Sequence, residues 1–316
     1  MSEVNETVRR QVLSAPCVDD SADIMLKSSD DHYLRAHRVF LVAALPIFTT
    51  MFSLPRPVSS IDGAEGSFRD AKDGLEVVQM FETKEELDML LRLIYPAPRP
   101  SLESTTQLKT ALRLAEKFDA EHVRNLAHLS LVRLTERASE AACVIAWDFQ
   151  LRDIARLAAK SSLSRPNLDH SANSEVDEAL LAYRRRCCAT AAASVRDLKW
   201  VKRAAWVRLW DAKGPCPGGC PDTESPCLSS RQLLLNGLRP VKNWLVTYLS
   251  AAYAAVQQRP QGSAVKTVDV FLGAATQAGG CQWCKDRAPL ALQRFAEVLA
   301  ARIDRKVDTV AFETSF

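Results

Sequence analysis

The first part of the chain alternates short extended segments with apolar helical ones. A half-buried strand is predicted over residues 21–27, where two sets of positions alternate: Ala22, Ile24 and Leu26 with Asp23, Met25 and Lys27. A second extended segment is expected at 32–36, followed by an apolar helix at 37–45. Pro46 is expected to open the next helix, since proline is tolerated at a first helical position, and this helix ends before Pro55.

A long polar segment separates these elements from the next group. Residues 53–74 are rich in Ser, Pro, Gly and Asp and indicate a loop, after which residues 75–81 alternate as a strand. Thr83 and Glu86 have the spacing of a capping box, which starts a helix that stops at Tyr95-Pro96. Apolar residues at helical spacing then predict two helices, centred on 108–118 and 123–134.

The later part of the chain is expected to be mostly helical. A helical pair is predicted at 139–161, with a bend near Phe149-Gln150-Leu151. Further helical stretches are expected at 177–212, 229–258, 264–278 and 287–305, interrupted by a loop rich in Cys, Pro and Gly. The fold class is therefore α+β, with a small sheet capped by helices followed by a mostly α-helical C-terminal half.

Changes in composition along the chain suggest how it is organised. We expect an N-terminal tail at 1–17, a first domain at 18–136, a helical extension at 137–161, a linker at 162–176 and a helical, cysteine-containing domain at 177–316. The formal net charge of +3 over 316 residues does not favour nucleic acid or an anionic membrane as the main partner. We find no secretory signal and no apolar stretch long enough to cross a bilayer, so an intracellular location is expected, in cytoplasm or nucleus.

The stretch SADIMLKSSDDHYLRAHRVFLVAALPIFTTMF resembles the BTB/POZ family, and the loop, strand and capped helix that follow also fit it. Leu45-Pro46 departs from the usual Ser-Pro. The resemblance implies self-association as a homodimer through the first helix and strand, and adaptor duty for a cullin-type ubiquitin ligase. Cullin-binding members often carry a hydrophobic-x-x-x-Glu pattern after the second helix, and MFSLPRPVSS has no glutamate there. The 139–161 pair resembles a helix that follows the domain in fungal BTB proteins.

Three polar residues in the matching stretch are candidates for a site. Asp23 lies in the first predicted strand and Arg38 begins a helix that should pack nearby, so the two could form a buried ion pair, and either alone would cost several kcal/mol. The resemblance implies that these two residues line a charged pocket at the dimer interface, while the alternative is that both are solvated. His37 is implied to be a packing and hydrogen-bonding residue, since no nucleophile or carboxylate pattern accompanies it.

Cysteines in the second half are candidate metal ligands. The sequence KGPCPGGCPDTESPC is followed later by GGCQWCK, so the candidates are Cys216, Cys220, Cys227, Cys281 and Cys284. A C-x-x-C pair can place two thiolates around one tetrahedral ion, which makes a structural zinc ion one interpretation. Free thiols in loops, or disulfide and redox chemistry, are the alternatives. In a reducing compartment disulfides are not the default.

Protein association is the function that these patterns favour, and we expect the protein not to be an enzyme. The basic cluster at 183–186 is more simply explained by helix packing than by nucleic-acid binding. The alternative function is a transcriptional or chromatin-associated regulator, in which BTB dimerisation accompanies a zinc-ordered C-terminal module.

Overall fold

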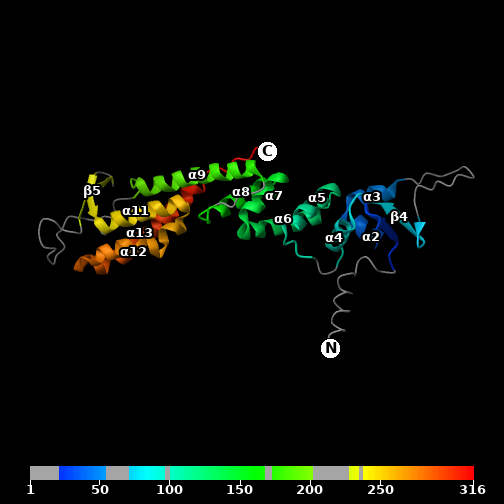
Figure 1. Cartoon of the computed structure of the whole chain (residues 1–316), viewed down its shortest axis with the longest axis horizontal. Coiled ribbons are helices and arrows are strands. Elements are labelled where there is room, and N and C mark those ends of the chain that lie inside the picture. The colour runs from blue at the N-terminus through cyan, green and yellow to red at the C-terminus, as the bar shows by residue number, and fades with distance from the viewer. Residues whose placement is uncertain (1–20, 55–70, 97–99, 168–172, 202–227, 235–237) are drawn as a thin grey trace, which may run out of the picture. The chain divides into compact units, whose positions relative to one another are not determined.

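The computed structural model describes residues 21–54, 71–96, 100–167, 173–201, 228–234 and 238–316 (Figure 1). The described residues fold into two compact units, one ending at Arg137 and the other beginning at Ala138. The first contains a sheet and helices, and the second is mostly helical, so the expected α+β fold class is confirmed. The helical pair that we expected as a separate extension lies in the second unit.

The first unit is built on a four-stranded sheet with strand order β2-β1-β4-β3. The strands are β1 (Ile24–Lys27), β2 (Tyr33–Ala36), β3 (Ala71–Lys72) and β4 (Leu75–Gln79). β1 is antiparallel to β2 and parallel to β4, with Met25 opposite both Arg35 and Val77. The parallel pair needs a crossover, and helices α2 and α3 lie within it.

The central position of β1 corrects one detail of the sequence prediction. We expected a strand buried on one face only, yet Ile24, Met25 and Leu26 are all buried. A strand with neighbours on both sides and cover on both faces has no solvated face, so alternation is not required. Met25 therefore belongs to the core, although it stands in the predicted polar set.

Strands β3 and β4 form a short hairpin, with β3 at the edge of the sheet opposite to β2. Lys72 pairs with Leu75, and the two residues between them, Asp73 and Gly74, have φ angles of 54° and 76°. Two successive positive φ values are typical of a type I′ turn, for which Asp-Gly is a favoured sequence. The strand β3 that precedes this turn lies where the sequence analysis expected only loop.

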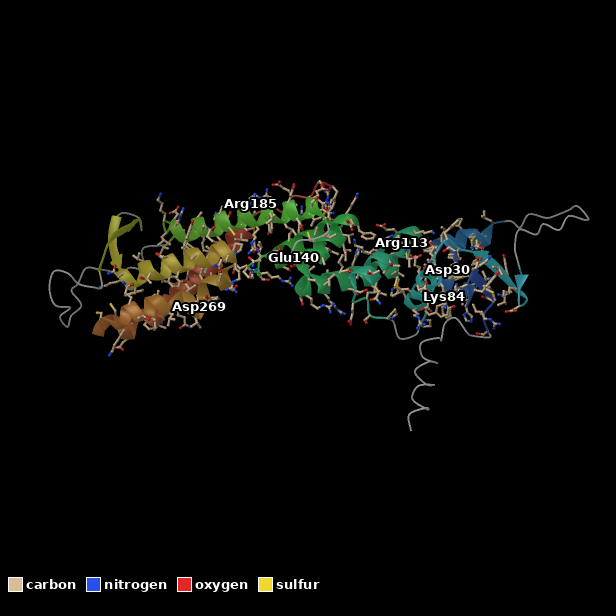
Figure 2. All side chains as sticks on the ribbon, in the orientation of Figure 1. Asp30, Lys84, Arg113, Glu140, Arg185 and Asp269 are labelled. Carbon is tan, nitrogen blue, oxygen red and sulfur yellow. The ribbon has the colours of Figure 1, made fainter. Side chains whose placement is uncertain are left out.

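The helices of the first unit follow the predicted boundaries closely. They are α2 (Arg38–Ala44), α3 (Pro46–Ser53), α4 (Lys84–Ile94), α5 (Thr105–Lys117) and α6 (Glu121–Arg137). Pro46 occupies the first turn of α3, and both hydrogen bonds of the capping box between Thr83 and Glu86 are present. In addition, the N–H of Lys84 donates to Asp30 Oδ1 at 3.0 Å, which ties α4 to the turn after β1 (Figure 2).

The second unit packs six α-helices and a short 3₁₀ helix around an apolar core in its described part. These are α7 (Ser139–Asp148), α8 (Arg152–Ser162), α9 (Ser174–Arg196), α11 (Asn243–Gln258), η1 (Gly262–Lys266), α12 (Val268–Gly279) and α13 (Gln282–Val307). Asn173 caps α9, since its side-chain oxygen accepts from the N–H groups of Glu175 and Val176. The bend expected at 149–151 is present between α7 and α8.

Two of the helices expected in this half have different bounds. The stretch 229–258 is helical only from Asn243, because β5 (Leu228–Leu234) and β6 (Leu238–Lys242) pair as an antiparallel hairpin. Pro240 explains part of the difference, since a proline inside a helix removes a hydrogen bond and clashes with the preceding turn. The helix expected at 177–212 ends at Arg196, and residues 202–212 lie outside the described ones.

The last described residues fold back onto the second unit. Phe312 is buried between Trp147 and Tyr183, with ring centroids at 6.2 and 5.5 Å. The ring of Phe316 meets Trp147 edge-on at 5.1 Å. Arg186 holds the same segment by donating to the carboxylate of Glu313 and to the carbonyl of Ala311. The segment therefore links the end of α13 to α7 and α9.

Candidate interaction site of the first unit

The start of α2 brings the predicted polar residues together around its first turn. The backbone N–H of Arg38 donates to Asp23 Oδ1 at 2.8 Å, so the carboxylate just before β1 caps the helix from outside it. Such an anion at a helix N-terminus also interacts favourably with the helix dipole. Asp23 is exposed, and the desolvation cost of a fully buried carboxylate therefore does not arise.

The guanidinium of Arg38 has a partner that the sequence analysis did not single out. It forms an ion pair with Glu76 of β4 and lies over the ring of Phe52, with Cζ 5.0 Å from the centroid. Arg38 and Asp23 thus meet through the backbone amide of Arg38, and the ion pair of the Arg38 side chain with Glu76 joins α2 to β4. Glu76 could have been suspected from sequence only by knowing that β4 lies beside β1.

His37 forms a hydrogen-bonded link between α2 and the end of α4. Its backbone N–H donates to Tyr95 Oη at 2.9 Å, and its Nδ1 lies 3.0 Å from the same oxygen. Its Nε2 lies 2.8 Å from Ser21 Oγ. Either tautomer of the imidazole satisfies these contacts: Tyr95 donates to Nδ1 while Nε2–H donates to Ser21, or Nδ1–H donates to Tyr95 while Ser21 donates to Nε2. These contacts give His37 a positioning role at the start of the helix.

An exposed apolar surface lies beside this turn on α2 and α3. The side chains of Val39 and Val42 are 65% and 37% exposed, and they share a helix face because they are three residues apart. On α3, Ile47 is 49% exposed. Leu54, just after α3, adds to this set at 63%. Exposed apolar side chains that cluster on a protein surface often mark protein-interaction sites. We call these four residues the α2–α3 surface.

The candidate zinc ligands are only partly among the described residues. Cys281 occupies the N-cap position of α13 and Cys284 lies in its first turn, and both are 5% exposed. Cys216, Cys220 and Cys227 lie outside the described residues. Within the residues that the structure describes, no group of three or more His, Cys, Asp and Glu side chains is placed to hold a metal ion. The pair at α13 supplies two of the four ligands that a structural zinc site needs.

Three other cysteines have the surroundings of packing residues. Burial raises the pKa of the Cys143 thiol to about 12 and that of Cys187 to about 11, and it also raises the pKa of Cys188. A thiol is reactive mainly as the thiolate, so these groups are poorly suited to nucleophilic or redox chemistry near neutral pH.

Comparison with known proteins agrees with this arrangement of strands and helices. Residues 17–133 match the family model of the BTB/POZ domain, over nearly the range expected from the sequence. No curated protein matches the chain. Among the described residues, none of the helices combines the length and apolar character that a membrane crossing requires. The chain therefore contains a BTB/POZ domain, a protein-interaction module, in its first 133 residues.

Proposed function

We propose that the protein acts by association, with the BTB/POZ domain joining two copies of the chain through the α2–α3 surface. The observation that carries this proposal is the exposure of Val39, Val42, Ile47 and Leu54, which lie on α2, on α3 and just after α3. Each of these side chains gains about 1–2 kcal/mol when it leaves water, so a symmetric contact doubles the effect.

The topology of the sheet bears on which part of the domain makes the contact. β1 is paired on both sides, by β2 and β4, so its backbone groups are not available to a second copy. Self-association through the first helix is compatible with this order, because the exposed face of α2 lies away from its buried residue Leu41. The helix rather than the strand edge is therefore the expected contact.

The mass of the full-length protein in solution tests this proposal. Light scattering after size exclusion should give a dimer at micromolar concentration, and Val39→Asp should give a monomer because it places a carboxylate in the contact. Leu129→Asp is a matched control, since Leu129 is a similarly exposed leucine (62%) on α6. A monomeric wild type, or a Val39→Asp protein that stays dimeric, would contradict the proposal.

We further propose that the chain is a substrate adaptor for a cullin-type ubiquitin ligase, in which the second unit holds the substrate. The side chain of Phe81, which is 84% exposed just after β4, supports this, since it offers an apolar anchor outside the α2–α3 surface. Purified cullin should be retained by the immobilised full-length chain and lost on Phe81→Asp, with the dimer mass unchanged. Retention of duplex DNA instead of cullin would favour the regulator described above.

A structural zinc ion held by Cys281 and Cys284 with thiolates from Cys216, Cys220 or Cys227 also stays a proposal. Two buried thiols in one helical turn support it, because a C-x-x-C pair is a common half-site for zinc. Such an ion would stabilise the fold of the second unit without taking part in any reaction.

A further inference from the structure

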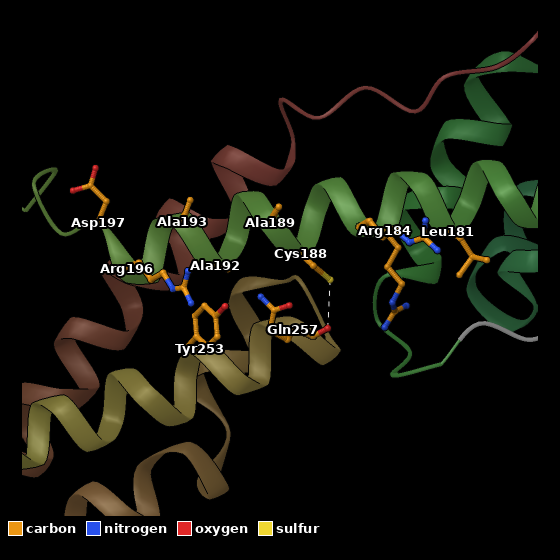
Figure 3. Close-up of a pocket in the computed structure, with 11 residues that line it drawn as sticks. Leu181, Arg184, Cys188, Ala189, Ala192, Ala193, Arg196, Asp197, Tyr253 and Gln257 are labelled. Atoms are coloured by element: carbon orange, nitrogen blue, oxygen red, sulfur yellow. Dashed lines mark hydrogen bonds between the residues drawn. The ribbon is translucent and has the colours of Figure 1, made fainter.

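A groove with a volume of about 770 Å³ lies between α9 and α11 in the second unit (Figure 3). Its floor consists of small side chains of α9: Cys188, Ala189, Ala192 and Ala193. Tyr253 and Gln257 of α11 form the opposite wall. This volume is within the range of sites that bind small ligands or peptide segments, and the floor leaves room for side chains to enter.

The charge of this groove is strongly one-sided. Three arginines line it, Arg184, Arg185 and Arg196, against one acidic residue, Asp197. Asp197 is engaged elsewhere, since its Oδ1 accepts from the N–H of Lys199 at 3.0 Å and its side chain projects away from Tyr253 (Figure 3). The groove therefore presents positive charge that its own lining does not neutralise.

The three arginines differ in what they already bind. Arg184 is buried and donates to backbone carbonyls, as a structural residue would. Arg185 and Arg196 are exposed, and no carboxylate of the described chain forms an ion pair with either. Arg196 is positioned by Tyr253, with its Cζ 4.4 Å from the ring centroid. Such stacking holds a guanidinium in place while its N–H groups can still bind a carboxylate.

The spacing of Arg185 and Arg196 determines what can bridge them. They are eleven positions apart on one straight helix, so they share a face and lie about 16 Å apart along the axis. A single small anion cannot contact both. An extended peptide rises about 3.3 Å per residue, so acidic residues about five positions apart would match both arginines.

We propose that the α9–α11 groove binds an extended acidic peptide segment of a partner protein, with one carboxylate at Arg185 and another at Arg196. Between them, a small or apolar side chain of the peptide lies over Ala189 and Ala192 and against the ring of Tyr253. The peptide proposal rests on the proposed function that the second unit holds a partner protein. It adds the chemistry by which that partner is recognised.

Fluorescence anisotropy with the full-length protein and a labelled peptide tests the groove. The probe is Glu-Ala-Leu-Ala-Ala-Glu with amidated and acetylated ends, and the comparison peptide carries Lys in place of each Glu. The acidic peptide should bind, and the affinity should fall at least tenfold for Arg185→Glu/Arg196→Glu. The doubly reversed protein should instead bind the lysine peptide, which a protein damaged in folding would not do.

Two further variants separate the groove from general charge effects. Arg294→Glu/Arg305→Glu reverses two exposed arginines that are also eleven positions apart, on α13, and should leave the affinity within twofold. Ala189→Phe fills the exposed floor without changing charge, and should weaken binding at least fivefold.

Three outcomes would overturn the proposal. The acidic peptide does not bind; the α13 pair of substitutions lowers its affinity as much as the groove pair does; or inorganic phosphate and anionic lipid vesicles displace the labelled peptide as well as the unlabelled peptide does. The last would identify a general anion site. Failure of the self-association test would leave these results unaffected, because the light-scattering experiment examines α2 and the peptide experiment examines α9. The two proposals can therefore fail separately.

Discussion

Replacing Arg184 is expected to destabilise the second unit more than any exposed charge would. Arg184 is 9% exposed, and its guanidinium donates to the carbonyls of Ser162, Arg165, Pro166 and Gln258. These carbonyls come from the last residue of α8, from the turn that follows it and from the end of α11, so this side chain of α9 joins α8 to α11. Arg184→Met retains much of the volume but leaves the carbonyls without this donor.

The magnitude follows from these contacts. Removing one partner of a buried charged network costs about 3–5 kcal/mol, because the remaining polar groups stay desolvated. Arg184→Lys keeps the charge, but an ammonium cannot reproduce the planar fork, so we expect it to lose about half as much. With a urea m-value of about 2 kcal/mol/M, the midpoint of Arg184→Met should fall by about 2 M.

Tryptophan fluorescence reports this unit selectively, since all six tryptophans of the chain lie after residue 137. Urea titration of the full-length variants therefore measures the unit that contains Arg184. Arg185→Met is the matched control, because Arg185 is the exposed neighbour on the same helix, and its midpoint should stay within about 0.3 M of wild type. A midpoint for Arg184→Met inside the same range would refute the reasoning.

Three further predictions concern other sites. Burial and the nearby Arg124 lower the pKa of His128 below its ordinary value, so the unfolded state binds more protons and stability should fall as pH drops below about 6.5. Hydrogen exchange of α6 at pH 7.5 and 5.5 measures this, and His128→Gln should flatten the slope. Tyr95→Phe removes the acceptor of the His37 N–H, which should cost about 1–3 kcal/mol and speed exchange of that amide; unchanged exchange would contradict this. Native mass spectrometry should show one zinc ion per chain, lost with a chelator or in Cys284→Ser; an apo mass before chelation would count against zinc.

Local signals in the sequence predict most of the first unit. The Thr83–Glu86 capping box and Pro46 each act within one helical turn, so their effects do not depend on the rest of the fold. The turn at Asp73-Gly74 was also predictable in this way, because Asp-Gly is a strong hairpin sequence. Asn236-Gly237 is an equivalent hairpin sequence between the paired strands at 228–242. The sequence analysis did not use it and expected one long helix there.

Features that depend on distant segments were not predictable from one sequence. Met25 is buried because β1 lies in the centre of the sheet and both of its faces are covered. The pairing of Arg38 with Glu76 follows from the parallel contact of β1 with β4. The α9–α11 groove forms because Tyr253 lies beside Arg196, although β5 and β6 separate these two residues along the chain. The spacing of Arg185 and Arg196 was visible in the sequence, but only the second helix shows that their face borders a groove.

The contact of Phe312 with Trp147 and Tyr183 has a consequence for the order of events during synthesis. At about 5–20 residues per second, the ribosome needs roughly 10–30 s to pass from Trp147 to Phe312. The BTB/POZ domain has left the ribosome by then and can fold and meet a second copy. Until Phe312 is synthesised, Trp147 and Tyr183 in the helices of the second unit lack their contact with its ring. If the chain self-associates as proposed, nascent chains are expected to pair before their second units close, and the apolar surface exposed in that interval favours chaperone binding.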